Sequence, residues 1–271
     1  MTRGIDCATP LTAKTAKAIA EAGYSFAGRY LVPPTGSLKW KALTKAECRH
    51  ITDAGLRILT VWETTADRAK EGAEAGAADA ARARKLAAEY GIPAGAAIYF
   101  AVDYDARKGD YGAIEAYIRA AKRQMNGEYL VGLYGSYSIV EEMASRGAAD
   151  CYWQCVAWSY GRVSEHRSVY QALFGQSVAG VAVDINECED MKKAGIWSYA
   201  DKFDEEDEDM TGEDIYRKLK DYLSTQPVPA WARDELQEAV DMGITDGTRP
   251  MELIPRYQAA IMAKRAAKAA K

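Results

Sequence analysis

Short runs of β-branched and aromatic residues alternate with longer, Ala-rich amphipathic stretches from residue 4 to about residue 188. Short apolar runs bounded by turn residues are typical of strands, whereas apolar positions that recur every three or four residues are typical of helices. The pattern predicts eight strands, at residues 4–8, 25–31, 57–64, 96–105, 129–136, 152–158, 168–172 and 180–185.

Helices are predicted between these strands, for example at residues 12–22, 44–54, 71–90 and 109–125. Glycines follow three of them, where a helix end favours a residue that tolerates positive φ. Strands that alternate with helices form parallel sheets in α/β proteins. Eight strands over residues 4–188 therefore predict a compact (β/α)₈ barrel of the TIM type, with an open doubly wound sheet as the alternative. The sequence contains no GxGxxG or Walker-type loop that would support a nucleotide-binding fold.

The composition changes abruptly after Trp197, and residues 201–210 are DKFDEEDEDM. A run of like charges cannot bury a core and is typical of a solvated linker. We therefore predict three parts: a catalytic barrel at residues 1–198, an acidic linker at 199–210 and a small helical module at 211–271. Within the module, helices are predicted near residues 212–223, 231–242 and from residue 255 onward.

Acidic residues stand at the ends of four predicted strands. They are Asp6 in GIDC, Glu63 in VWET, Asp103 and Asp105 in AVDYD, and Asp184 in VAVD. The carboxyl ends of the strands form the site of a (β/α)₈ barrel, so all five should converge in one pocket. A single acid at such a position often only caps a helix or bonds a loop amide. A cluster suits cleavage of a glycosidic bond, where one carboxylic acid protonates the leaving oxygen and another stabilises the oxocarbenium-like centre.

Side chains alternate between the two faces of a strand, so Asp103 and Asp105 should share the face of Tyr99 and Ala101. Ile98, Phe100 and Val102 should face the helices. This arrangement permits a division of labour in which Asp105 is the general acid and Asp103 orients the acetamide group of a 2-acetamido sugar that attacks its own anomeric carbon.

Residues near other predicted strand ends could line a sugar-binding cleft: Arg29, Tyr30, Tyr134, Trp158 and Gln171. Aromatic faces pack well against sugar rings, but with 17 Tyr and 6 Trp in the chain most aromatic residues must serve packing. Arg29 either pairs with one of the acids and holds it ionised, or forms a surface salt bridge.

Bulk composition excludes several classes of function. A net charge of −4 and a pI near 5.5 argue against a nucleic-acid partner, and no apolar run approaches the ~20 residues of a membrane span. The N-terminus lacks the pattern of a secretory signal peptide, which predicts a cytoplasmic protein. Five scattered cysteines and two histidines form no recognisable ligand set, so neither a metal nor another cofactor is expected.

The motifs GIDC, GRYL, VWETT, IYFAVDYD, GLYGSY and VAVDIN together resemble the glycoside-hydrolase-like (β/α)₈ barrels of actinobacterial proteins and phage endolysins, which are related to the family 25 lysozymes. The resemblance spans roughly residues 1–190. Family 25 muramidases carry Asp on the first strand, Asp-x-Glu on the fourth and Asp on the last, which here correspond to Asp6, Asp103 with Asp105, and Asp184. Because Asp105 replaces the Glu that is the general acid of the lysozymes, Glu63 is the alternative candidate for that role.

The C-terminal part resembles one S-layer-homology unit, through Trp231-Ala232, Gly243-Ile244, Asp246-Gly247, Arg249-Pro250 and Arg256. The resemblance implies binding to a secondary polysaccharide of the cell wall. A helix pair this small buries little area, so joining two copies of the chain as a homo-oligomer, or docking on the barrel, is the alternative.

The leading hypothesis is a phage or prophage endolysin: a glycosidase of bacterial peptidoglycan, of the N-acetylmuramidase type, that stays in the host cytoplasm until lysis and then reaches the cell wall. The second hypothesis is a catalytically inactive glycan-binding barrel, in which Asp105 marks the loss of chemistry. An amidase or peptidase is disfavoured because the sequence offers no zinc ligand set and no suitable Cys/His pair.

Overall fold

The computed structural model describes residues 1–201, 216–217, 219–220, 222–223, 226–245, 248 and 256–269. The chain divides into two compact units, Met1–Asp204 and Glu205–Lys271. The boundary between them falls inside the predicted linker, most of which (residues 202–210) lies outside the described residues.

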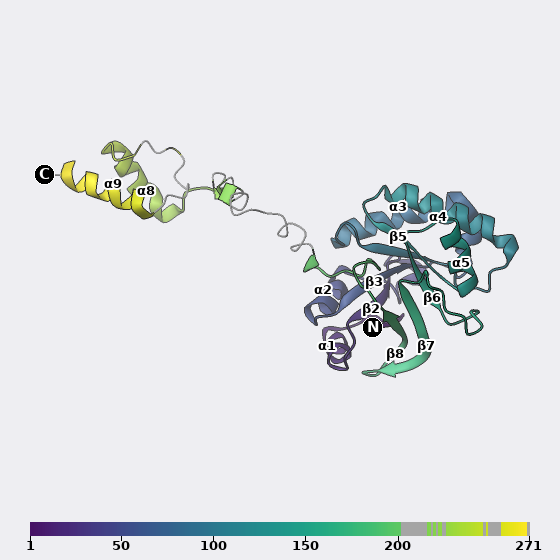
Figure 1. Ribbon diagram of the computed structural model, residues 1–271. Coiled ribbons are helices and arrows are strands. Elements are labelled where there is room, and N and C mark those ends of the chain that lie inside the picture. Colours follow the sequence, from purple (N-terminus) through teal and green to yellow (C-terminus); the bar gives the residue numbers. More distant parts are fainter. Residues whose placement is uncertain are drawn as a thin grey trace. The chain divides into compact units, whose positions relative to one another are not determined.

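The first unit is a closed barrel of eight strands in sequence order within residues 1–201 (Figure 1). The closed barrel predicted from the sequence is therefore confirmed, and the open doubly wound sheet is excluded. Each of β1 to β6 is parallel to the strand that follows it, but β8 is antiparallel to both of its neighbours, β7 and β1. The strands are β1 (Thr2–Asp6), β2 (Phe26–Tyr30), β3 (Arg57–Trp62), β4 (Ala97–Ala101), β5 (Leu130–Gly135), β6 (Cys151–Cys155), β7 (Val169–Val178) and β8 (Val181–Cys188).

Within residues 1–201, α-helices connect only the first six strands. They are α1 (Ala13–Glu21), α2 (Lys45–Asp53), α3 (Gly72–Tyr90), α4 (Tyr111–Met125) and α5 (Tyr137–Ser145), joined by the short 3₁₀ turns η1 (Gly36–Leu38), η2 (Arg68–Glu71) and η3 (Lys108–Asp110). In Figure 1, α1 and α2 lie on one side of the barrel and α3 to α5 on the other.

The end of the barrel departs from the predicted strand and helix alternation. A loop without helix joins β6 to β7 across the described residues 156–168. Ala179 and Gly180, with φ of 51° and 77°, then turn the chain directly from β7 into β8. Two central residues with positive φ form the tight turn that suits an antiparallel hairpin, so β8 returns alongside β7 instead of crossing over through a helix. The expectation of an all-parallel sheet is wrong at this strand.

Side chains alternate along β4 as predicted. Ile98 and Phe100 pack in the cluster that joins the barrel to its helices. Tyr99 and Ala101 pack in a second cluster with residues from the other strands, which fills the barrel interior. This interior is a packed core, as in other closed barrels of eight strands.

The segment after β8 covers the end of the barrel where β3 and β4 begin. The Tyr99 hydroxyl donates to the carbonyl oxygen of Ala194 at 2.8 Å, and the amide of Ala97 donates to that of Gly195 at 2.9 Å. Trp197 forms a bridge with Ile58 and is buried. This segment leaves uncovered the opposite end of the barrel, where the parallel strands finish.

The second unit contains a short η4 turn (Ala230–Ala232), helix α8 (Arg233–Asp241) and helix α9 (Arg256–Ala269). Helices α8 and α9 lie close to those predicted at residues 231–242 and from residue 255 onward. The helix predicted at residues 212–223 falls largely outside the described residues and stays a prediction. Residues 246–247 and 249–255, which carry much of the S-layer-homology resemblance, lie outside the described residues. The resemblance therefore stays a prediction. None of the helices in the described part of the chain is long and apolar enough to cross a membrane.

Candidate functional site

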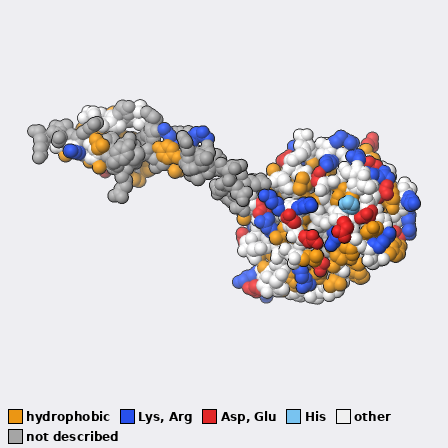
Figure 2. Space-filling view, viewed as in Figure 1, with side chains coloured by type: hydrophobic (Ala, Val, Ile, Leu, Met, Phe, Trp, Pro, Cys, Tyr) orange, Lys and Arg blue, Asp and Glu red, His pale blue; other side chains and the backbone are white. Residues whose placement is uncertain are grey.

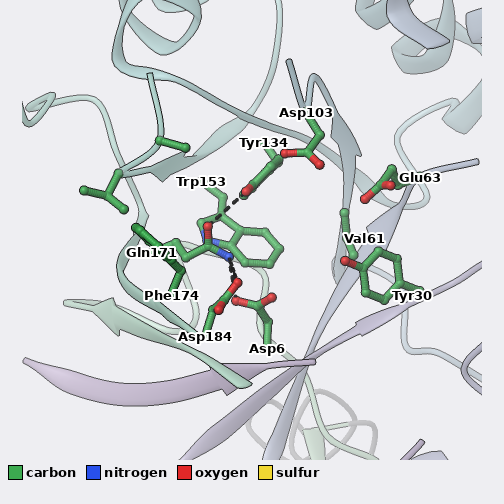
Figure 3. A pocket seen from close by; sticks show the side chains of 12 residues that line it. Asp6, Tyr30, Val61, Glu63, Asp103, Tyr134, Trp153, Gln171, Phe174 and Asp184 are labelled. Atoms are coloured by element: carbon green, nitrogen blue, oxygen red, sulfur yellow. Dashed lines mark hydrogen bonds between the residues drawn. The ribbon is translucent and has the colours of Figure 1, made fainter. Parts of the chain in front are cut away.

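A cavity of about 220 Å³ opens where the parallel strands end (Figure 3). Four of the five predicted acids line it, together with three of the five predicted substrate-binding residues. The lining residues are Asp6, Tyr30, Val61, Glu63, Asp103, Tyr134, Trp153, Val156, Ala157, Gln171, Phe174 and Asp184. The structure thus brings most of the predicted site residues together at one cavity.

Asp6 and Asp184 lie opposite each other in the register of β1 and β8. Asp6 ends β1, as predicted, but Asp184 lies in the middle of β8. Because β8 is antiparallel, its first half runs beside the carboxyl end of β1. Asp184 therefore reaches the predicted pocket, although it does not stand at the carboxyl end of a parallel strand.

Two side-chain amides hold one oxygen of Asp6. Asn186 Nδ2 donates to Asp6 Oδ2 at 2.7 Å, and Gln171 Nε2 donates to the same oxygen at 2.9 Å. Gln171 Nε2 also lies 3.3 Å from Asp184 Oδ2. The amide of Gln171 therefore ties the two facing carboxylates together.

The side-chain amides of Asn186 and Gln171 are held in one orientation, because turning either oxygen toward Asp6 would break a hydrogen bond that this oxygen accepts. The indole nitrogen of Trp153, which can only donate, donates to Asn186 Oδ1 at 2.8 Å. The Tyr134 hydroxyl donates to Gln171 Oε1 at 3.0 Å. Both amide nitrogens are thereby directed at Asp6 Oδ2, and a proton on Asp6 must be carried by the other oxygen, Oδ1.

Burial raises the proton affinity of two cavity carboxyl groups, those of Asp6 and Asp103. Burial raises the pKa of Asp6 to about 7. The hydrogen bonds from Asn186 and Gln171 lower this pKa, and the negative charges of Asp184 and Asp103 raise it further. Burial also raises the pKa of Asp103, with a contribution from the charge of Glu63. A carboxyl group whose pKa lies near 7 can both donate and accept a proton at neutral pH.

Glu63 has a cationic partner. Lys41 Nζ lies 3.2 Å from Glu63 Oε1 and 4.2 Å from the centre of the Tyr30 ring. Both charged side chains are largely buried. This ion pair supplies a fixed carboxylate on the wall of the cavity opposite Gln171 and Phe174 (Figure 3).

Asp105 does not reach the cavity, so the expectation that five acids converge is wrong for this residue. Strand β4 ends at Ala101, so the alternation of faces stops before Asp103. Beyond that point the backbone bends, with the amide of Asp103 bonded to the carbonyl oxygen of Ala66. Asp105 instead pairs with Arg107 on the surface.

Arg29 and Trp158 also do not line the cavity. Arg29 is fully buried, pairs with Glu47 of α2 at 2.6 Å and donates to the carbonyl oxygen of Cys7. It therefore contacts neither a cavity acid nor the surface, and both of its predicted roles are wrong. Trp158 lies in the loop after β6, and the tryptophan that reaches the cavity is Trp153 within β6.

Sequence reasoning missed Lys41, Trp153 and Asn186. Asn186 could have been found, because it follows Asp184 by two residues in a strand and therefore shares its face. Gly28 was also overlooked: a Cβ atom there would lie 2.6 Å from the Cβ of Asp6, so only glycine leaves room for the acid.

Charged residues of both signs are interspersed on the face of the barrel in view, without the continuous basic stripe of a surface that binds nucleic acid (Figure 2). In the part of the chain that the structure describes, no group of three or more His, Cys, Asp and Glu residues is arranged to hold a metal ion.

Comparison with known families assigns the barrel. Residues 17–188 match the model of the Rv2525c-like, glycoside hydrolase-like domain. The chain belongs to this family. The Rv2525c-like match begins after β1 and therefore does not include Asp6, which the barrel register places at the site.

Individual proteins resemble this Rv2525c-like barrel in sequence and in fold. The uncharacterized protein FadG of Bacillus subtilis (strain 168) is 32% identical over 155 residues, a match that spans 54% of this chain and 27% of FadG. The Tat-secreted protein Rv2525c of Mycobacterium tuberculosis, solved with L-tartrate, is 25% identical with a TM-score of 0.63, over 73% of this chain and 99% of Rv2525c.

A more distant structure shares the fold alone. GHIP of Streptococcus pneumoniae, described as a glycosyl hydrolase 25 that participates in host cell invasion, is 13% identical with a TM-score of 0.51. The alignment covers 72% of this chain and 90% of GHIP. The motifs predict a relation to the family 25 barrels, and this chain shares its fold with one of them.

Proposed function

We propose that the Rv2525c-like barrel is a glycosidase of bacterial peptidoglycan, of the N-acetylmuramidase type. The observation that carries this proposal is the cavity in which Asp6, Glu63, Asp103 and Asp184 meet, with Asp6 able to exchange a proton near pH 7. The shared fold with a family 25 glycosyl hydrolase supports a glycan as the substrate.

In the proposed reaction, Asp6 takes the role that sequence reasoning gave to Asp105. The proton on Asp6 Oδ1 passes to the leaving oxygen as the bond from the anomeric carbon to that oxygen breaks. Asp103, on the other side of the cavity, orients the acetamide group of the sugar, whose oxygen bonds to the anomeric carbon as the leaving oxygen departs. Water then adds to the anomeric carbon, the bond to the acetamide oxygen breaks, and the proton of the water passes to Asp6. The carboxylates of Glu63 and Asp184 stabilise the positive charge that develops on the sugar.

The test is mass spectrometry of the fragments released from purified Gram-positive peptidoglycan. The wild-type protein is expected to release fragments with new reducing-end muramic acid. Asp103→Asn should release none, because it removes a cavity carboxylate, whereas the matched control Asp105→Asn should act as the wild type does, because Asp105 lies outside the cavity. If Asp105→Asn is inactive, Asp105 and not Asp6 is the general acid. If the wild type releases fragments with new reducing-end glucosamine, the muramidase assignment is contradicted.

A second candidate function is a glycan-binding barrel without catalysis. The placement of Asp105 favours it, because the residue at the position where lysozymes carry their general acid does not line the cavity and pairs with Arg107. If the wild-type protein sediments with peptidoglycan but releases no fragment of any kind, the barrel is a binding module and not an enzyme.

The endolysin role and the C-terminal module belong to the same proposal. The protein would accumulate in the cytoplasm of an infected bacterium and reach the wall at lysis, with the module binding a secondary wall polysaccharide. Removal of residues 205–271 should leave the compact barrel unit folded and reduce the fraction that sediments with walls. Equal sedimentation would reject the anchoring role, and a loss of dimers in ultracentrifugation would assign the module to oligomerisation instead.

A further inference from the structure

The hairpin of β7 and β8 contains an irregularity beside the cavity. The register shifts between Gln171 and Leu173 and again between Leu173 and Gln176. Gly175 has a φ of 68°, a conformation that favours glycine. Bulges of this kind re-aim side chains and are frequent next to active sites.

The bulge has two visible consequences. The amide of Gly175 donates to Asp184 Oδ1 at 2.8 Å, which fixes a cavity carboxylate to the hairpin backbone. Phe174, the residue before, lines the cavity and yet remains 68% exposed. Figure 3 shows Phe174 close to Gln171 and Asp184, across the cavity from Glu63 and Tyr30.

Packing does not account for Phe174. A large aromatic side chain that is two-thirds exposed gains little from the core, and it belongs to neither of the two buried clusters. The hairpin could carry a polar residue here without loss of packing. An exposed aromatic ring at the edge of a cavity is instead typical of a binding surface.

The size of the cavity indicates what this surface would bind. Its volume of about 220 Å³ is below the ~300–1,000 Å³ of usual small-ligand sites, so only a short part of a glycan chain fits inside. The remaining sugars must leave the cavity over its rim. On the hairpin side, the rim offers the exposed ring of Phe174.

We propose that Phe174 is a stacking platform for a sugar ring that lies outside the cavity, beyond the part of the glycan held among the carboxylates. The ligand is then a linear glycan of several sugars, bound through the apolar C–H face of one ring, and not a monosaccharide or disaccharide. This inference rests on the proposed function, because it assumes that the cavity receives a glycan.

The experiment compares Phe174→Ala, Phe174→Tyr and Leu173→Ala on a series of soluble peptidoglycan oligosaccharides of increasing length. Leu173 is the matched control, because it is the neighbouring residue, is 51% exposed and does not line the cavity. Phe174→Ala is expected to raise KM on the long oligosaccharides about three- to tenfold, with kcat retained and little change on the shortest. Phe174→Tyr and Leu173→Ala should keep the wild-type KM.

Equilibrium binding of the same oligosaccharides is measured alongside, so that a barrel that binds without cutting is also tested. If the wild type binds or cuts the oligosaccharides and Phe174→Ala behaves identically at every length, the platform is rejected and the proposed function stands. If the wild type neither binds nor cuts any of them, the proposed function fails and the platform fails with it. A fall in kcat alone, at unchanged KM, would also overturn the platform.

Discussion

Replacement of Asp6 by Asn is expected to lower the rate of peptidoglycan cleavage by about 10²–10⁴-fold, the usual contribution of a general acid. Asn keeps the geometry of the site, because its single carbonyl oxygen can accept both hydrogen bonds that Asn186 and Gln171 donate to Asp6 Oδ2. What it removes is the transferable proton. In the wild type, kcat/KM should fall above pH 7, where Asp6 ionises.

The same substitution is expected to stabilise the barrel. The pKa of Asp6 is raised from 3.8 to about 7 in the folded protein, so folding favours the protonated form. The contribution of the Asp6 carboxyl group to the free energy of unfolding is fully present below its pKa in the unfolded chain, near 4. This contribution is lost as the pH rises toward 7. Asn cannot ionise, so the variant avoids this loss, which amounts to a few kcal/mol.

Thermal unfolding from pH 4 to pH 8, beside a pH profile of activity, measures both effects. Asp6→Asn and the wild type should unfold at similar temperatures at pH 4, and the variant should be the more stable at pH 8. The control Asp105→Asn, at a residue that lies outside the cavity, should show neither effect. An active Asp6→Asn would transfer the proton-donor role to Asp103, whose pKa is also raised by burial.

Much of the barrel could be predicted from sequence because each strand carries its own local signal. The inner and outer faces of β4 follow from alternation alone, and the clusters around Tyr99 and Phe100 confirm them. The direction of β8 has no such signal. Its hairpin turn at Ala179-Gly180 lacks the Asn-Gly or Asp-Gly pair that marks such turns, and the bulge before it, which contains Gly175, resembles a loop.

The site was predictable for residues that lie inside regular strands or within two residues of their carboxyl ends, as Glu63 and Asp103 do. Asp6 and Asp184 lie inside strands, and they face each other. Asp105 lies farther beyond the end of its strand, where alternation no longer fixes the direction of a side chain. Lys41 lies in a loop and reaches Glu63 only through the folding of distant segments, so no local pattern could have identified it.

Arg29 shows how a residue outside the cavity can determine its shape. Its guanidinium binds both oxygens of Glu47 and donates to the carbonyl oxygens of Cys7 and Lys41. Cys7 follows Asp6, and Lys41 pairs with Glu63. Arg29 therefore links α2 to the chain segment that follows Asp6 and to the one that carries the cationic partner of Glu63.

Replacement of Arg29 by Met is accordingly expected to lower the free energy of unfolding by about 3–5 kcal/mol, because it leaves Glu47 charged and buried without its partner. Urea denaturation measures the loss. The matched control Arg84→Met breaks an exposed pair with Glu128 and should cost less than about 1 kcal/mol. The double variant Arg29→Met with Glu47→Leu should recover part of the stability, since no unpaired charge remains. A loss below about 1 kcal/mol in Arg29→Met would mean that water reaches Glu47, and that the Arg29–Glu47 pair does not hold the site together.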